Sequence, residues 1–349
     1  MPAATDEARV LRSCLWELTL RCNLRCMHCG SVAGASRAGE LSLGECLRVA
    51  DEVLALGCED MTFIGGEVFL FDGWERLARH CADYGVAVNI MTNGYRFGSH
   101  EIGAIQQAGL RNVGISLDGM ETNHNRIRGR PDAFAHILRA FDLLNAAEIP
   151  IGVVTSLFEW NAGDLEPMYE LLLAHDVTLW QLQLVNPMGN MAGRRDLILD
   201  PARIPALTAF VRDKCLQRRM AVLAADNIGY FDENESYIRG ARWPLVCWDG
   251  CQAGLTSVFI DSAGNVKGCG ALYDDRFVEG NVRRHTLREI WFGSATFRYN
   301  RAFDVSLLGG RCRDCAIGDT CRGGCRASNY FCTGSLYQNA FCHGFHPTT

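Results

Sequence analysis

The chain has 349 residues, of which 48% are hydrophobic and 21% charged, a composition typical of a globular protein. Its formal net charge of -6 offers no basic surface for nucleic acid, and no apolar run approaches the ~20 residues that cross a bilayer. We therefore expect neither nucleic acid nor a membrane as a partner. Because the N-terminus lacks a secretory pattern, we expect a cytoplasmic protein.

Short apolar segments alternate with helix-patterned segments through the first two thirds of the chain. The strand candidates are residues 14–20, 60–64, 86–92, 112–118, 149–156 and 177–185. The helix candidates are residues 43–56, 73–83, 99–108, 132–146 and 164–174. This alternation predicts an α/β fold with a parallel sheet and helical crossovers.

The rest of the chain is less regular. Residues 186–246 contain one expected helix near 205–219, and from Cys247 onward the chain is rich in Cys, Gly and Arg. There we predict only a hairpin at 256–268, which turns at Gly264–Asn265, and a short helix near 286–292. A domain boundary near 240 gives a tail at 1–12, a core with a bridging helical region at 13–240 and a cysteine-rich domain at 241–349.

Seventeen cysteines are the unusual feature of the composition. In a cytosolic chain, cysteines are more often metal ligands or reactive thiols than disulfide partners. Cys22, Cys26 and Cys29 follow the first strand candidate with the spacing C-x3-C-x2-C. Three thiolates on a [4Fe–4S] cluster leave one iron open to a substrate or cofactor. The alternative from these residues alone is a zinc site with His28 as the fourth ligand.

Polar motifs follow later strand candidates, at the edge where parallel α/β folds keep their active sites. The motif Gly65-Gly66-Glu67 combines close backbone approach with a carboxylate that suits an ammonium group. Asn93 is either a polar contact or a turn former. Ser116 lies near the C-terminal end of the fourth strand candidate, and Arg128 is either a bidentate carboxylate ligand or part of a solvated loop.

Eight cysteines near the C-terminus form a second pattern. They are Cys247, Cys251 and Cys269, then the run Cys312, Cys315, Cys321 and Cys325, and finally Cys342. Four-cysteine sets hold either iron–sulfur clusters or zinc. Cys332 could take the place of Cys342.

With all these motifs in order, the sequence resembles the radical S-adenosylmethionine (radical SAM) enzymes that carry a C-terminal SPASM domain. The resemblance implies a partial (β/α)6 TIM-type barrel followed by a small cysteine-rich α+β domain. It implies three [4Fe–4S] clusters, of which Cys22, Cys26 and Cys29 hold the one that binds SAM. The two auxiliary clusters would be held by Cys247, Cys251, Cys269 and Cys325 and by Cys312, Cys315, Cys321 and Cys342.

The resemblance also implies how the enzyme works. SAM would contact Gly65, Gly66, Glu67, Asn93, Ser116 and Arg128, although Val68 departs from the proline that often follows this glutamate. Reductive cleavage of SAM would give a 5′-deoxyadenosyl radical, which abstracts a hydrogen atom from the substrate. No catalytic acid or base is assigned. Cys215, outside the motifs, could donate a hydrogen atom or simply pack in the core.

Enzymes with this domain pair mostly modify peptides, so we expect a ribosomally made peptide that is crosslinked, oxidised or epimerised. The first strand begins near residue 14, so we expect any leader-peptide-binding domain to be a separate protein. We expect the electron donor to be of the flavodoxin or ferredoxin type. Gly270 stands where formylglycine-forming relatives carry an aspartate, which disfavours that reaction. The alternatives are a small molecule, such as an aminosugar or a porphyrin side chain, and a non-catalytic electron carrier or zinc scaffold.

Overall fold

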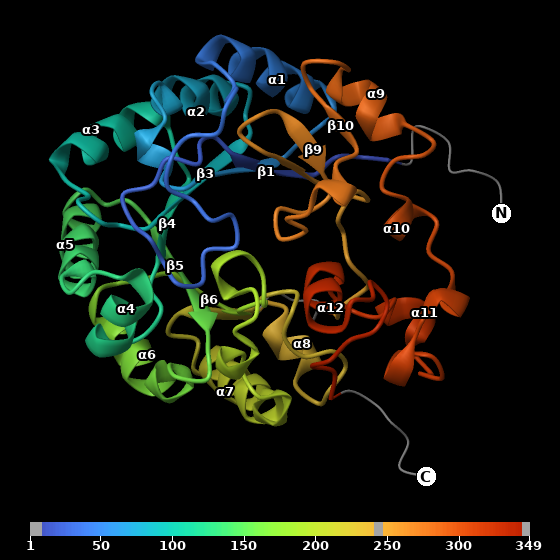
Figure 1. Cartoon of the computed structure of the whole chain (residues 1–349). Coiled ribbons are helices and arrows are strands. Elements are labelled where there is room, and N and C mark those ends of the chain that lie inside the picture. The colour runs from blue at the N-terminus through green and yellow to red at the C-terminus, as the bar shows by residue number, and fades with distance from the viewer. Residues whose placement is uncertain (1–8, 241–246, 344–349) are drawn as a thin grey trace.

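The computed structural model describes residues 9–240 and 247–343, which form one curved sheet surrounded by helices (Figure 1). The sheet has ten strands in the order β10-β9-β8-β1-β2-β3-β4-β5-β6-β7, and β1 to β7 run parallel. The partial TIM-type barrel is confirmed, with one parallel strand beyond the six predicted. The barrel strands are β1 (Ser13–Glu17), β2 (Asp60–Ile64), β3 (Ala87–Thr92), β4 (Asn112–Ser116), β5 (Ile151–Leu157), β6 (Leu179–Leu184) and β7 (Ala221–Ala224).

Each crossover between parallel strands contains at least one helix. All six helices predicted before residue 240 are confirmed to within two residues at each end, whereas α4 and α8 were not predicted. The first helix begins after Ser42, whose side chain forms a capping box with Glu45. The helices are α1 (Leu43–Ala55), α2 (Trp74–Asp83), α3 (Ser99–Ala108), α4 (Glu121–Arg128), α5 (Ala133–Ala146), α6 (Leu165–Ala174), α7 (Ile204–Gln217) and α8 (Glu235–Ile238).

Side chains alternate between the two faces of the sheet, as the pleat requires. On β1, Trp16 is fully buried in the hydrophobic core that includes residues of the surrounding helices. Its neighbour Leu15 lies on the other face and lines an internal cavity. The outer face of the sheet therefore packs in the hydrophobic core and stabilises the fold, whereas the inner face lines the cavity.

The cysteine-rich region joins the same sheet. The predicted hairpin is confirmed as β8 (Ser257–Ile260) and β9 (Asn265–Lys267), followed by β10 (Gly280–Asn281). Its predicted turn at Gly264–Asn265 is wrong, because the turn lies at residues 261–264 and Asn265 already belongs to β9. The parallel pairing of β8 with β1, from Ser13 opposite Ser257 to Trp16 opposite Ile260, was not predicted. The remaining helices are α9 (Leu287–Phe292), which was predicted, and α10 (Arg298–Arg301), α11 (Gly318–Cys321) and α12 (Arg326–Thr333).

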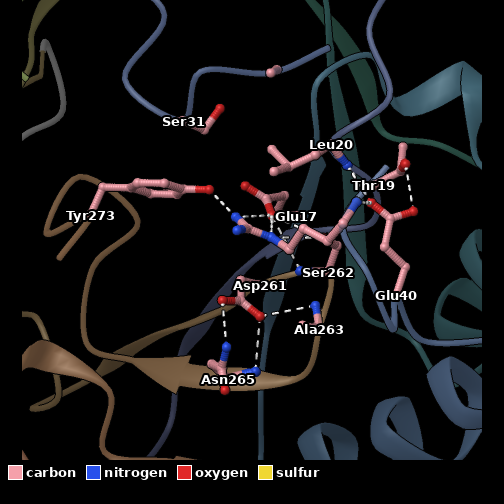
Figure 2. Close-up of polar contacts among 12 residues, drawn as sticks. Glu17, Thr19, Leu20, Ser31, Glu40, Asp261, Ser262, Ala263, Asn265 and Tyr273 are labelled. Carbon is pink, nitrogen blue, oxygen red and sulfur yellow. Dashed lines mark hydrogen bonds and ion pairs between the residues drawn. The ribbon is translucent and has the colours of Figure 1, made fainter. Parts of the chain in front are cut away.

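Buried polar contacts fix this junction (Figure 2). Glu17, at the end of β1, accepts hydrogen bonds from Nη2 of Arg37 at 3.0 Å and from the hydroxyl of Ser262 at 3.1 Å. Arg37 also contacts the hydroxyl of Tyr273. Glu40 accepts from a hydroxyl and a backbone N–H just after β1. Glu17 therefore joins the barrel to the hairpin.

A second polar contact lies on the surface of the junction. Arg283, after β10, donates to both carboxylate oxygens of Glu45 in α1, at 2.6 and 3.0 Å.

The predicted domain limits at residues 12 and 240 stay predictions, and residues 1–8 and 241–246 lie outside the described part of the chain. Within the described ranges, no helix is both long and apolar enough to cross a bilayer.

Candidate active site

The cysteine trio lies in the loop that follows β1. The sulfur of Cys22 accepts a hydrogen bond from the backbone N–H of Leu24 at 3.4 Å, and that of Cys29 from Ala33 at 3.2 Å. Nitrogen donors of this kind favour sulfur in its negatively charged form. Burial raises the pKa of Cys22 to about 11, so its thiolate form needs a positive partner, which a bound iron–sulfur cluster would supply.

A buried charge cluster stands behind this loop. Nη2 of Arg128, at the end of α4, lies 2.7 Å from Oδ2 of Asp118, and Nη1 lies 3.7 Å from the sulfur of Cys26. Nε2 of His28 lies 3.5 Å from the same Asp118 oxygen. Burial lowers the pKa of His28 to about 4, so its imidazole is neutral at pH 7. Burial opposes ionisation of Asp118, but the charge of Arg128 keeps the pKa of that carboxyl below its ordinary value.

Unpartnered polar atoms test whether a cofactor fits here. Among the described residues, Nδ1 of His28, Nε of Arg128 and Nε2 of His124 are buried without a hydrogen-bond partner. Buried polar atoms are nearly always paired with protein, water or a ligand. Three thiols with nitrogen donors, next to unsatisfied polar groups, therefore fit an iron–sulfur cluster with a polar cofactor. In the part of the chain that the structure describes, no group of three His, Cys, Asp or Glu side chains is arranged to hold a single metal ion.

The motif Gly65-Gly66-Glu67 packs against the end of β1. A Cβ added at Gly66 would lie 2.4 Å from the carbonyl oxygen of Arg21, so close backbone packing requires glycine there. Glu67 is buried and accepts hydrogen bonds from the hydroxyl of Thr92 at 2.8 Å and the backbone N–H of Asn93 at 2.9 Å. Burial raises the pKa of Glu67 to about 7.

A cavity of about 830 Å³ runs along the inner face of the sheet. Cys29 and Arg128 line it on the side of the N-terminal loop, whereas Cys251, Cys269 and Cys325 line it on the side of the cysteine-rich region. This volume is within the range of small-molecule and cofactor sites. One space therefore meets predicted ligands of two different clusters.

The predicted SAM contacts divide into two groups. Ser116 and Arg128 line this cavity. The others, which are Gly65, Gly66, Glu67 and Asn93, are not among its lining residues. Asn93 nevertheless approaches the trio, because its Nδ2 lies 3.7 Å from the sulfur of Cys22.

The second predicted auxiliary set surrounds a pocket of its own. Its lining includes Cys312, Cys315, Cys321 and Cys342. The structure thus brings together four cysteines that lie up to 30 positions apart in the sequence. Of the first auxiliary set, three cysteines meet at the large cavity, whereas Cys247 is exposed and lines neither pocket.

Two further cysteines lie outside these sites. Cys215, on α7, donates to the carbonyl oxygen of Val222 at 2.9 Å and does not line the large cavity. We therefore give it no catalytic role. Cys332 packs against the hydrophobic core, and burial raises its pKa to about 11.

Family models match both halves of this arrangement. The model of the radical SAM superfamily matches residues 16–172, and that of the SPASM iron–sulfur cluster-binding domain matches residues 251–316. The chain is a radical SAM protein with a SPASM domain. The match to the second model spans the hairpin and includes four of the eight C-terminal cysteines, namely Cys251, Cys269, Cys312 and Cys315.

Curated relatives of this radical SAM protein have two kinds of name. An AdoMet-dependent heme synthase of Methanosarcina barkeri is 28% identical over 98% of both chains. Mycofactocin maturase MftC of Mycobacterium ulcerans is 29% identical over 90% of this chain and 83% of its own.

Solved structures share the fold. Streptococcus suis SuiB bound to S-adenosylmethionine superposes on 96% of this chain and 78% of its own, with a TM-score of 0.76 and 16% identity. The structure of anSMEcpe with bound AdoMet and a peptide covers 94% of this chain and 92% of its own, with a TM-score of 0.69 and 19% identity.

Sequence reasoning missed two polar residues, one behind the cysteine trio and one in the wall of the large cavity. Asp118 was not predicted as a site residue, although it is the ion-pair partner of Arg128. Its position, two residues after Ser116 at the end of a strand, was the available signal. Asp226 follows β7, a strand that was not predicted, so no sequence pattern placed it in the cavity.

Proposed function

We propose that this chain is an oxidoreductase that holds three [4Fe–4S] clusters and modifies a ribosomally made peptide. The proposed SAM-binding cluster is held by Cys22, Cys26 and Cys29. The proposed auxiliary clusters are held by Cys247, Cys251, Cys269 and Cys325 and by Cys312, Cys315, Cys321 and Cys342. With the first cluster and SAM bound, the site supplies a 5′-deoxyadenosyl radical that removes a hydrogen atom from the substrate.

The observation that carries this proposal is the shared cavity. Cys29 and Arg128 form one wall, and Cys251, Cys269 and Cys325 form another. A substrate in this space touches both the SAM side and the auxiliary side, as an oxidation that passes electrons onward requires. Arg128 has an unsatisfied Nε and is suited to orient the carboxylate of SAM.

The proposal of a peptide substrate is supported by the maturase relatives. MftC matches nearly the whole chain, and the sporulation killing factor maturation protein SkfB of Bacillus subtilis is 32% identical over 45% of it. We further propose an electron donor of the flavodoxin or ferredoxin type and a separate leader-peptide-binding protein.

The test is anaerobic turnover of the reconstituted protein. We expect 5′-deoxyadenosine when SAM and dithionite are added, and a mass change in a precursor peptide encoded by a neighbouring gene. If a protein with its full complement of iron forms no 5′-deoxyadenosine, the non-catalytic electron carrier replaces this proposal.

A second candidate is favoured by one comparison. The heme synthase of Methanosarcina barkeri matches 98% of both chains. In that case the substrate is a tetrapyrrole with carboxylate side chains. Incubation with an iron porphyrin that bears propionate groups separates the two candidates, because only this one predicts a product that has lost carbon dioxide and two hydrogen atoms from a propionate group.

A further inference from the structure

A carboxylate that has no ion-pair partner among the described residues lies in the wall of the large cavity. Asp226 directly follows β7, is exposed, and lines the cavity together with Cys251, Cys269 and Cys325. Within residues 9–240 and 247–343, its carboxylate makes no hydrogen bond or ion pair. Burial against the cavity wall raises the pKa of Asp226, and the nearby Arg239 lowers it. The carboxylate is thus accessible from the cavity that it lines.

The backbone around Asp226 is held from two sides. The side chain of Asn227 accepts a hydrogen bond from the backbone N–H of Leu184 at 3.1 Å and donates one to the carbonyl oxygen of Leu184 at 2.8 Å. These two bonds attach the segment after β7 to the end of β6. The hydroxyl of Tyr230 donates to the carbonyl oxygen of Asp226 and accepts from the backbone N–H of Cys325 at 3.0 Å. Asp226 is therefore tied both to the barrel and to a proposed cluster ligand.

Tyr230 itself has a costly conformation. Its φ of 143° lies in a region that residues other than glycine rarely adopt. Its ring is buried and packs edge-on against Trp248, with ring centroids 5.4 Å apart. Such strain persists only where the surroundings enforce it, and here it places the hydroxyl between the two chain segments.

Most other charged groups of the cavity wall are already paired. Arg239 donates to Glu235 at 2.8 Å, and Arg128 pairs with Asp118. The side chain of Asp60 pairs with that of Arg111 outside the cavity lining. The exception is a fully buried arginine, Arg326, which donates to Asn300 and to backbone carbonyl oxygens. Asp226 is thus the carboxylate of this wall that has no ion-pair partner among the described residues, because the nearby Arg239 is paired with Glu235.

A carboxylate without an ion-pair partner among the described residues favours a ligand of opposite charge. An ammonium or guanidinium group would replace the water at the carboxylate with a charge-assisted hydrogen bond. Gln181 and Gln183 also line the cavity and are neutral, so they do not compensate the charge of Asp226. Charge pairs between a protein and its ligand contribute mainly to the specificity of binding.

We propose that Asp226 binds a cationic group of the substrate, so that the peptide is recognised through a lysine or arginine side chain or a free amino group. This inference rests on the proposed function, because it names the class of peptide that enters the same cavity. It assigns Asp226 a role in binding the substrate and none in the cleavage of SAM.

The test measures binding without turnover. Anaerobic, unreduced holoenzyme with SAM is titrated calorimetrically with the capped peptide acetyl-Gly-Lys-Gly-amide and with its neutral counterpart, in which norleucine replaces lysine. We expect the wild-type protein to bind the lysine peptide at least about tenfold more tightly, a preference that 1.4 kcal/mol provides. Asp226→Asn should abolish the preference, and Asp226→Glu should retain part of it.

The matched control is Glu233→Gln. Glu233 is exposed, lies seven positions from Asp226 and does not line the cavity. This variant changes the net charge by the same amount and should keep the full preference. Iron content and circular dichroism are compared for all variants, and if Asp226→Asn loses iron, Asp226→Ser is judged by the same criterion.

Two results would overturn the inference. One is equal binding of the two peptides by the wild-type protein, and the other is a lysine preference that survives in Asp226→Asn. The proposed function fails in a different way. In that case the protein with full iron content forms no 5′-deoxyadenosine, while the binding preference is measured all the same.

Discussion

Removing the charge of Asp118 should destabilise the protein strongly. Asp118 is 0% exposed and Arg128 is 5% exposed, and their side-chain atoms lie 2.7 Å apart. Asparagine at position 118 can still accept the hydrogen bond that Oδ1 receives from the backbone N–H of Ser156 at 2.8 Å. The change therefore leaves a buried guanidinium without its counter-charge, which costs about 3–5 kcal/mol.

The assay compares two variants by urea denaturation of the anaerobic protein without SAM, followed by circular dichroism. We expect Asp118→Asn to be less stable than the double variant Asp118→Asn/Arg128→Met, because the latter also removes the unpaired charge. The reasoning is refuted if the double variant is as unstable as the single one, or if Asp118→Asn changes the unfolding free energy by less than about 1 kcal/mol.

Three other changes probe the junction, the glycine motif and the second auxiliary set. The hydrogen bond from Arg283 lowers the pKa of Glu45 to about 2. The destabilisation caused by Arg283→Ala should therefore be full at pH 6 and should shrink as the pH falls below about 4.5. If the urea midpoints of variant and wild-type protein differ equally at pH 6 and pH 3, this prediction is contradicted. Gly66→Ala should lower the free energy of unfolding by about 1–3 kcal/mol and reduce iron uptake. The control is Gly103→Ala, where the added Cβ meets no atom within 4 Å. This control should not destabilise the protein in the same urea denaturation experiment. Cys315→Ala should lose about four irons but still form 5′-deoxyadenosine, and unchanged iron content would remove this cysteine from the ligand set.

The parallel barrel could be predicted because its strands and helices are long enough to show their own patterns. The seventh strand could not, since Ala221–Ala224 has only four residues and little β-branched character. It is held by pairing with β6 and by the side chain of Asn227, and both are tertiary contacts. The position of Asp226 depends on this strand, so it could not be predicted either.

Helix α4 shows a different limit. Its sequence ETNHNRIR is almost entirely polar, with Ile127 as its one large apolar side chain, so no apolar face indicated a helix and none was predicted around Arg128. The helix ends at Gly129, whose φ is 71°, and this geometry directs Arg128 inward to Asp118. The sequence motif therefore identified the arginine but neither its helix nor its partner.

Contacts between distant parts of the chain were beyond reach. The pairing of β1 with β8 joins Ser13 to Ser257, and no local pattern in a single sequence indicates it. The resemblance to SPASM enzymes, in contrast, implied a set of four cysteines that the structure gathers around one pocket. The spacing alone would have grouped Cys325 with Cys312, Cys315 and Cys321, whereas Cys342 lines the pocket in its place.

The central claim is that the N-terminal trio holds the cluster at which SAM is cleaved. The direct measurement is iron content and 5′-deoxyadenosine formation for the variant Cys22→Ala/Cys26→Ala/Cys29→Ala beside the wild-type protein. We predict that iron falls from about twelve to about eight atoms per chain and that 5′-deoxyadenosine formation is lost. A variant that keeps twelve irons, or still forms 5′-deoxyadenosine, would contradict the account.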